Sequence, residues 1–270
     1  MQTGAKLIAD IDGTRVKSGE AAFWWLGQHS FVVKTARRVL YFDPFLSPEP
    51  DRLIPPLLAP AEVAHANFIF GSHDHLDHID RAALPALAQA SSASRLVVPE
   101  LLRESLARDL AIPAGRFFGL DDGQTVEIDG VRVSAVAAAH EFLDQDPATG
   151  RFPYLGYIVE CDGVTIYHAG DTCIYEGLVT KLRRWNIDLA FLPINGRDAR
   201  RLAAGWIGNM TYQEAADLAG SIRPRLTIPA HYDMFAFNPG DVAAFADYMR
   251  VKYPQLAVRV CEHGARNSFS

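Results

Sequence analysis

Residues His73-Asp74-His75-Leu76-Asp77-His78 (HDHLDH) place four strong metal ligands within one short segment. They directly follow the apolar stretch Asn67–Ser72 (NFIFGS), in a chain that has only 9 histidines among its 270 residues. Chance seldom gathers three histidines and an aspartate in this way, so the segment predicts a metal site. Because four ligands from one turn would crowd a single small ion, the pattern favours two ions.

Three further candidate ligands share one sequence context, since each ends an apolar segment that predicts a strand. His140 ends the run that begins at Val131, Asp171 lies in the motif His168–Thr172 (HAGDT), and His231 follows Leu226–Pro229. Loops at one end of the strands commonly carry the functional site, so we expect these side chains to meet the HDHLDH segment.

We divide the candidate ligands between two ions so that each ion keeps an open position for water, as hydrolytic catalysis requires. We assign His73, His75 and His140 to the first ion and Asp77, His78 and His231 to the second. Asp171 would bridge the two ions. Imidazole and carboxylate ligands without a thiolate suit zinc, manganese or iron, and we expect two divalent ions, zinc or manganese.

Strand and helix signals alternate along both halves of the chain. Asp129-Gly130 and Asp162-Gly163 predict hairpin turns, and Thr211 with Glu214 forms a capping box that opens a helix ending near Ile222. We predict the following strands and helices: strands 22–35, 38–42, 68–70, 95–99, 124–128, 131–137, 154–161, 164–167, 189–192, 226–229 and 257–261, and helices 80–89, 100–109, 177–184, 211–222 and 241–252. Two β-rich halves with helices predict an α/β (α+β) fold, a four-layer αββα sandwich formed by one domain, residues 1–270.

Composition narrows the class of protein. The net charge of −6 argues against nucleic acid as a partner, since nucleic-acid-binding domains usually present a basic face. Cys161, Cys173 and Cys261 form no disulfide framework and fit a reducing compartment. No apolar run is long enough to predict a membrane span or a secretory signal. We therefore expect a cytoplasmic protein without a membrane partner.

The motifs together resemble the metallo-β-lactamase superfamily: H-x-H-x-D-H, a histidine after a strand, G-D-T and a later strand-end histidine occur in the expected order. A closer resemblance, to the L-ascorbate-6-phosphate lactonase branch of metal-dependent hydrolases, covers nearly the whole chain. It rests on Phe23–Gly27 (FWWLG), Ser72–Asp80 (SHDHLDHID), Tyr167–Thr172 (YHAGDT), Asn209–Ala215 (NMTYQEA) and Ile228–Pro239 (IPAHYDMFAFNP). The resemblance implies the αββα fold, a cytoplasmic location, manganese or zinc, and a plausible homo-oligomer.

Further residues are candidates for supporting roles. Asp43 could orient a ligand histidine, although a turn aspartate before Pro44 is an equal alternative. His168 is either a supporting residue or a packed one. For His29 and His263 we favour surface positions over the mouth of a pocket.

Substrate contacts are predicted from the connection between two ligand-bearing strands. Arg197, Arg200 and Arg201 cluster there, and arginines suit bidentate binding of phosphate. Phe235, just after His231, could line the pocket. The alternatives are a solvated loop for the arginines and a core position for Phe235.

We predict a metal-dependent hydrolase of a small anionic ester or lactone, in which Asp77 and Asp171 act on metal-activated water. The main alternative is a phosphodiesterase or nuclease on the same dinuclear scaffold, which should have a basic groove. A di-iron oxidoreductase would need an electron-donating flavin domain. A non-catalytic binding protein should have lost some of the ligands, and here every position is filled.

Overall fold

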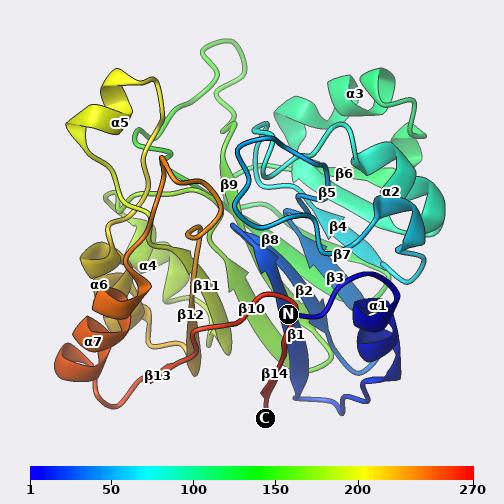
Figure 1. The fold of residues 1–270 in the computed structure, drawn as a ribbon. Helices are drawn as coiled ribbons and strands as arrows, with labels where there is room; N and C mark the ends of the chain where they lie inside the picture. Colours follow the sequence, from blue (N-terminus) through cyan, green and yellow to red (C-terminus); the bar gives the residue numbers. More distant parts are fainter.

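The computed structural model describes residues 1–270, and its centre is two sheets packed face to face with helices outside them (Figure 1). In sheet order the first sheet consists of β14 (Arg266–Phe269), β1 (Ala21–Gly27), β2 (Ser30–Lys34), β3 (Val39–Phe42), β4 (Phe68–Phe70), β5 (Arg95–Pro99) and β6 (Phe117–Leu120). The second consists of β13 (Ala257–Val258), β12 (Leu226–Ala230), β11 (Leu189–Pro193), β10 (Val164–His168), β9 (Leu155–Cys161), β8 (Val131–Ala137) and β7 (Thr125–Ile128).

Helices cover both outer faces and complete the four layers predicted from the sequence. The first sheet is covered by α1 (Gly4–Gly13), α2 (Leu84–Ala90) and α3 (Glu100–Asp109), and the second by α4 (Leu178–Leu182), α6 (Tyr212–Ile222) and α7 (Val242–Lys252). The short helix α5 (Ala199–Ala203) stands away from the sheets, and two 3-10 turns occupy Pro60–Glu62 and Ala114–Arg116. The predicted αββα sandwich is therefore confirmed.

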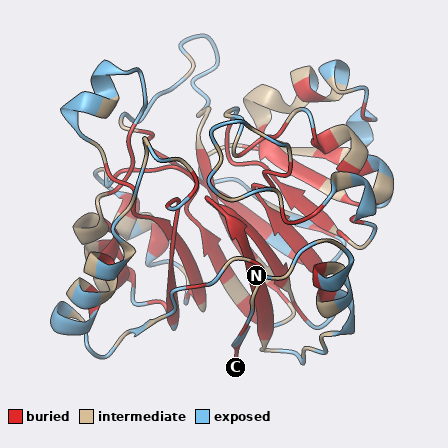
Figure 2. Cartoon of the chain, viewed as in Figure 1, coloured by how far each residue is buried: buried red, intermediate tan, exposed pale blue.

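Alternating side chains explain why the strands lie between layers. In β1, Phe23 and Trp25 belong to the core between the sheets, whereas Trp24 and Leu26 belong to the core under the first-sheet helices. A strand that is buried on both faces loses the hydrophobic–polar alternation of a half-exposed strand. Figure 2 shows the result, with buried strands in the centre and exposed surface on the outer helices.

Strand direction brings the ligand-bearing loops together. β3 and β4 are parallel neighbours, as are β10, β11 and β12. The carboxyl ends of parallel strands meet at one edge of a sheet, and ligands commonly bind there. Because the two sheets face each other, the loops from both sheets meet at one end of the sandwich.

Several boundaries differ from the prediction. The single strand expected over residues 22–35 is two strands, β1 and β2, joined by a tight turn at Gln28 and His29. The helix expected over residues 80–89 begins at Leu84, and residues 81–83 form a turn in which the backbone N–H of Ala83 donates to the carboxylate of Asp80. The final predicted strand covers only Ala257–Val258, and α1, α5, β6 and β14 were not predicted. None of the helices is both long enough and apolar enough to cross a bilayer.

Candidate metal centre

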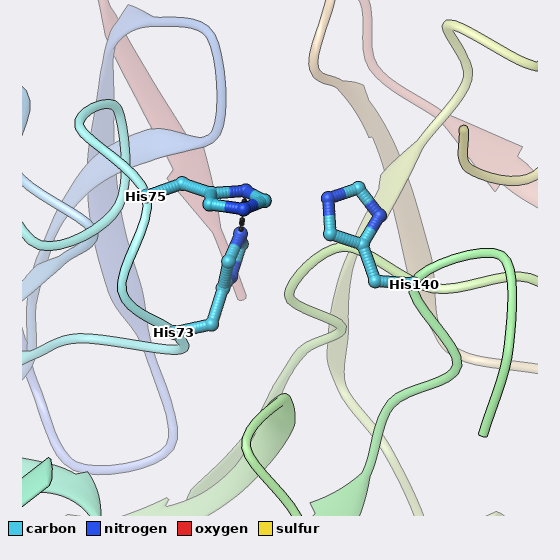
Figure 3. Close-up of side chains that lie close together, drawn as sticks. All are labelled: His73, His75 and His140. Atoms are coloured by element: carbon cyan, nitrogen blue, oxygen red, sulfur yellow. Dashed lines mark hydrogen bonds between the residues drawn. The ribbon is translucent and has the colours of Figure 1, made fainter. Parts of the chain in front are cut away.

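The first predicted ligand group forms a compact cluster. Nε2 of His73 lies 2.9 Å from Nδ1 of His75, and the ring of His140 approaches from another loop (Figure 3). One nitrogen of each of the three rings lies within 4.8 Å of the others. Nδ1 of His140 is held 3.2 Å from the carbonyl oxygen of Gly208, which leaves Nε2 free to face the cluster. Three converging nitrogens are a suitable donor set for one ion.

The second predicted group lies beside the first. Oδ2 of Asp77 is 3.6 Å from Nε2 of His78 and 3.6 Å from Nε2 of His231. His231 follows β12, so this group joins a ligand from the second sheet to the HDHLDH segment that follows β4. The two halves of the chain therefore share one centre.

Asp171 lies between the two groups. Its Oδ2 atom is 3.0 Å from Nε2 of His231 and 3.6 Å from Nε2 of His140, while its Oδ1 atom is 3.3 Å from Nε2 of His78. The fold thus brings all the predicted ligands together in the grouping that the two-ion assignment requires. Their role as ligands stays a prediction.

Buried atoms without partners indicate that the cluster fits a divalent cation. Nε2 of His78 and Oδ1 of Asp171 are buried and have no hydrogen-bond partner. An unpaired buried polar atom is costly, and in native proteins such atoms usually have a partner, which includes bound ions. Imidazole nitrogen and carboxylate oxygen are the donors that zinc and manganese accept.

The charge states of the side chains favour metal binding as well. Burial lowers the pKa values of His73, His75 and His140, so these rings stay neutral at pH 7. Burial raises the pKa of Asp171, but the facing His231 and His78 outweigh burial and hold it well below its usual value. Neutral imidazoles and an ionised carboxylate are the forms that bind a metal, so these four side chains release no proton on binding. Burial lowers the pKa of His78, but Asp171, Asp77 and Asp43 outweigh burial and raise it well above its usual value, so this ring has to lose a proton to bind an ion.

Asp43 supports the centre from behind, as predicted for a residue that orients a ligand. Its Oδ2 atom accepts a hydrogen bond from Nδ1 of His78 at 2.6 Å, and its Oδ1 atom accepts one from the backbone of Ser72 at 2.8 Å. This contact turns Nε2 of His78 toward Asp171. His168 lies deeper, where its Nε2 atom donates to the carbonyl oxygen of His29 at 2.9 Å. It packs behind the centre and lies outside the ligand groups.

Two residues at the centre were missed by the sequence prediction. Nε2 of Gln28 donates to Oδ2 of Asp77 at 2.7 Å and lies 3.3 Å from Nε2 of His231. The surface position favoured for His29 is wrong, because the ring is fully buried and its Nδ1 atom lies 3.6 Å from Asp171. The signal was Gly27, whose φ of +105° marks a turn inside the predicted strand.

His263, the other histidine favoured as a surface residue, is also partly buried. Its ring stacks on Trp25 with 4.0 Å between ring centroids, and it is absent from the lining of the cavity at the metal centre. His263 is therefore half-buried beside Trp25 and does not reach the mouth of the cavity.

Strained backbone gathers around the centre. Gln28, Asp43 and His231 have φ values of +52°, +42° and +59°, a region that non-glycine residues seldom adopt. Each costs on the order of 1–3 kcal/mol and persists only where the surrounding structure enforces it. The backbone N–H of His231 donates to the carbonyl oxygen of Gln28 at 2.8 Å, which ties the two strained turns together across the sheets.

A cavity of about 280 Å³ opens at the centre. Its lining comprises polar residues, one glycine and an apolar group: Gln28, His75, Asp77, His140, Asp171, His231, Asn238, Gly205, Trp206, Ile207, Phe235 and Phe237. Phe235 is among these residues, and its role in substrate binding stays a prediction. Asp77 and Asp171, the predicted catalytic carboxylates, both face this space.

None of the three arginines predicted to contact substrate lines this cavity. Arg197 forms a bidentate ion pair with Glu214, at 2.7 and 2.8 Å, and its charge is already neutralised. Arg201 pairs with Asp198, the N-cap residue of α5, at 2.7 Å. Arg200 lies on α5 outside the cavity. The cluster stabilises its own loop, which is the alternative that the sequence left open.

Comparison with known families agrees with the fold and the centre. A family model described as a beta-lactamase superfamily domain matches residues 37–232, which include every predicted ligand. The chain belongs to the beta-lactamase superfamily. A relative from Thermococcus onnurineus, named UPF0173 metal-dependent hydrolase, is 31% identical over 210 residues. The matched region covers 77% of this chain and 83% of the relative.

Solved structures show the same fold at lower identity. Igni18, described as a metallo hydrolase from Ignicoccus hospitalis, matches with a TM-score of 0.72 and 20% identity over 93% of this chain and 99% of its own. An isothiocyanate hydrolase from Delia radicum gut bacteria matches with a TM-score of 0.71 and 16% identity over 92% and 99% of the two chains. The closer resemblance of this superfamily member to the L-ascorbate-6-phosphate lactonases stays a prediction.

Proposed function

We propose that this chain is a metal-dependent hydrolase that cleaves a small ester or lactone with metal-activated water. The observation that carries the proposal is the position of Asp171, whose two carboxylate oxygens face His78 and His231 at 3.3 and 3.0 Å beside an open cavity. The UPF0173 relatives named metal-dependent hydrolases support the same reaction class.

Two divalent ions, zinc or manganese, fit the two ligand groups. Bound there, they would supply a water of lowered pKa and an electrophile for the substrate carbonyl. His73, His75 and His140 would hold one ion and His78 and His231, with Asp77, the other. The chain's own contribution is to hold these groups in place before substrate arrives, so that little reorganisation accompanies the reaction.

Asp77 is the side chain best placed to handle a proton. It lines the cavity, and its Oδ2 atom is fixed by Nε2 of Gln28 at 2.7 Å. A carboxylate held in this way can accept a proton from an attacking water and deliver it to the departing oxygen. Asp171, which is more deeply buried, holds the two ligand groups at a fixed separation.

The reason for an anionic substrate is weaker than the sequence suggested. Arg197 and Arg201 are paired with Glu214 and Asp198, so neither offers a free cation to a phosphate. A substrate anion would have to interact with the ions themselves. We therefore propose the carbonyl ester or lactone as the reacting group and treat a phosphorylated lactone as one member of the test panel.

Elemental analysis of the purified protein, with a screen of lactones, phosphomonoesters and phosphodiesters, tests the proposal. The expected result is close to two divalent ions per chain and lactone or ester hydrolysis that a chelator abolishes and the metal restores. Hydrolysis of bis-p-nitrophenyl phosphate without lactone or ester turnover would favour a phosphodiesterase instead. Protein that binds no divalent metal would overturn both functions.

A further inference from the structure

The cavity at the metal centre has an apolar side that the proposed reaction leaves unexplained. Trp206 and Ile207 reach it from the loop after α5, and Phe235 and Phe237 reach it from the loop that follows His231. We call these four residues the apolar wall. These residues share one small cavity with His75, His140 and His231 of the centre. When one group of a substrate reacts at the centre, the adjoining part of the same substrate therefore contacts this wall.

The rings of the wall hold one another in place. Trp206 and Phe237 stack with 4.2 Å between ring centroids, and Phe235 and Phe237 stack at 5.1 Å with an interplanar angle of 16°. Phe235 also lies 6.3 Å from Phe45, a buried ring that Arg52 covers at 4.1 Å. A wall ordered before binding costs little entropy when a ligand packs on it.

Exposed apolar side chains surround the entrance. Of the large hydrophobic residues that the chain exposes, most lie at the ligand-bearing end, on loops or on α5: Leu53, Leu76, Phe142, Leu143, Ile174, Leu202, Trp206 and Ile207. Leu76 belongs to the HDHLDH segment, and the backbone of Leu53 donates to Met234, next to Phe235. Exposed apolar residues that gather at a cavity, and are scarce elsewhere, mark a binding surface for an apolar ligand.

The lining offers no partner for a remote anion. No lysine or arginine lines the cavity, whereas Asp77 and Asp171 do. Arg200 and Arg201 lie in a neighbouring hollow, on the other side of Trp206 and Phe237. A phosphate carried away from the reacting carbonyl would therefore meet apolar or acidic surface, which is unfavourable.

We propose that the substrate is a small uncharged ester or lactone whose aryl or alkyl group packs against the apolar wall. This inference rests on the proposed hydrolytic function and names its substrate class. Water adds to the carbonyl carbon, the bond from that carbon to the alkoxy oxygen breaks, and the departing oxygen takes up a proton. The products are a carboxylic acid and an alcohol, joined in one molecule if the substrate is a lactone. A cavity of about 280 Å³ suits a substrate of this size.

Matched lactones test the substrate class. Dihydrocoumarin carries an aryl group, γ-butyrolactone lacks one, and 6-phosphogluconolactone carries a phosphate. In Phe237→Ala we expect kcat/KM for dihydrocoumarin to fall about 10- to 100-fold, the loss that corresponds to removing one buried aromatic contact. The value for γ-butyrolactone should change less than about 3-fold, because it has no aryl group to lose. Val251→Ala is the matched control, since Val251 is 73% exposed on α7 and lies outside both the lining and the apolar residues at the entrance.

Ligand binding provides a readout that does not depend on turnover. Nitroaromatic compounds quench tryptophan fluorescence, and Trp206 is the one tryptophan that lines the cavity. We expect 4-nitrobenzyl alcohol to quench the metal-loaded protein saturably and the saturable part to disappear in Trp206→Phe. This conservative variant keeps an aromatic ring in the stack, so it also covers the case in which Phe237→Ala fails to fold.

The outcomes separate the inference from the function it rests on. Preference for 6-phosphogluconolactone, unchanged in Phe237→Ala and Trp206→Phe, would overturn the uncharged substrate class and leave the hydrolase intact. Saturable quenching without hydrolysis of any ester or lactone would overturn the proposed function while the wall remained a binding surface. Absence of saturable quenching by 4-nitrobenzyl alcohol, with equal turnover of the three lactones, would overturn the role of the wall.

Discussion

Oδ2 of Asp171 lies 3.0 Å from Nε2 of His231, although Asp171 follows β10 and His231 follows β12, two strands away in the same sheet. The other oxygen of the same carboxylate faces His78, a residue of the first half of the chain, at 3.3 Å. One carboxylate thus joins candidate ligands from both sheets, and its two oxygens lie closer to them than Asp77, whose Oδ2 atom is 3.6 Å from each of the same two rings.

Replacing Asp171 with Asn should therefore remove metal and activity together. The amide keeps the shape of the carboxylate but loses the charge that two ions share, so we expect bound metal to fall below one ion per chain. Activity should fall by about 10³-fold or more, a loss typical of removing a group that stabilises the transition state. Asp74→Asn is the control, because Asp74 belongs to the same HDHLDH segment but pairs with Arg81 at the surface. Wild-type metal content in Asp171→Asn would rule out the bridging role.

Asp43→Asn tests the support behind the ligands. Oδ2 of Asp43 accepts a hydrogen bond from Nδ1 of His78 at 2.6 Å. An asparagine amide at this position would bind the imidazole more weakly, and its own N–H could point toward Nδ1 of His78. Loss of a residue that orients a metal-binding histidine typically lowers metal affinity about 10- to 100-fold. Competition against a chromophoric chelator measures this affinity directly. An unchanged affinity would mean that packing alone orients His78.

Gly170→Ala should damage both stability and the centre. Gly170 has a φ of +60°, and a Cβ atom there would lie 2.5 Å from the carbonyl oxygen of Leu155. Gly177→Ala is the matched control, because its φ of +93° is equally unfavourable but its Cβ would meet nothing within 4 Å. Backbone strain costs both variants on the order of 1–3 kcal/mol. Only Gly170→Ala should also displace the neighbouring Asp171 and lower bound metal, and equal metal content in the two variants would contradict this.

Stability should fall as the solution becomes acidic, partly because of His263. Burial lowers the pKa of this ring to about 4, whereas in the unfolded chain it titrates near 6.5. Between these values the unfolded chain binds more protons, so the contribution of His263 to stability is complete above pH 6.5 and is lost as the pH falls toward 4. The loss is on the order of 1 kcal/mol per pH unit. The variant His263→Phe retains a ring on Trp25. Its free energy of unfolding, measured by urea titration at several pH values, should change less with pH between 4 and 6.5 than that of the wild type.

The sequence predicted the ligands because the pattern is local and chemically specific. Histidine and aspartate have few structural reasons to follow an apolar strand, so His140, Asp171 and His231 could be found without knowledge of the fold. The four layers were also predictable, since runs of apolar strands and helices admit few packed arrangements.

Features that depend on packing were not predictable in this way. His29 was placed at the surface because Gly27 is the one turn signal inside residues 22–35, and an isolated glycine in a strand pattern indicates a bulge as readily as a turn. The arginines of residues 197–201 matched a phosphate-binding pattern, but their carboxylate partners, Glu214 and Asp198, are revealed only by the fold. The apolar wall combines residues from two loops whose proximity no local pattern encodes.

The pairing of β14 with β1 joins residues that are synthesised at very different times. Phe269 and Arg266 lie opposite Ala21 and Trp24, so the first sheet gains its outermost strand only after residues 266–269 have left the ribosome. β1 leads directly into the turn that places Gln28 beside Asp77. A nascent chain that has exposed the HDHLDH segment but not His231 would present loose histidines to any metal in the cell. The full set of candidate ligands is therefore available only after His231 has been synthesised.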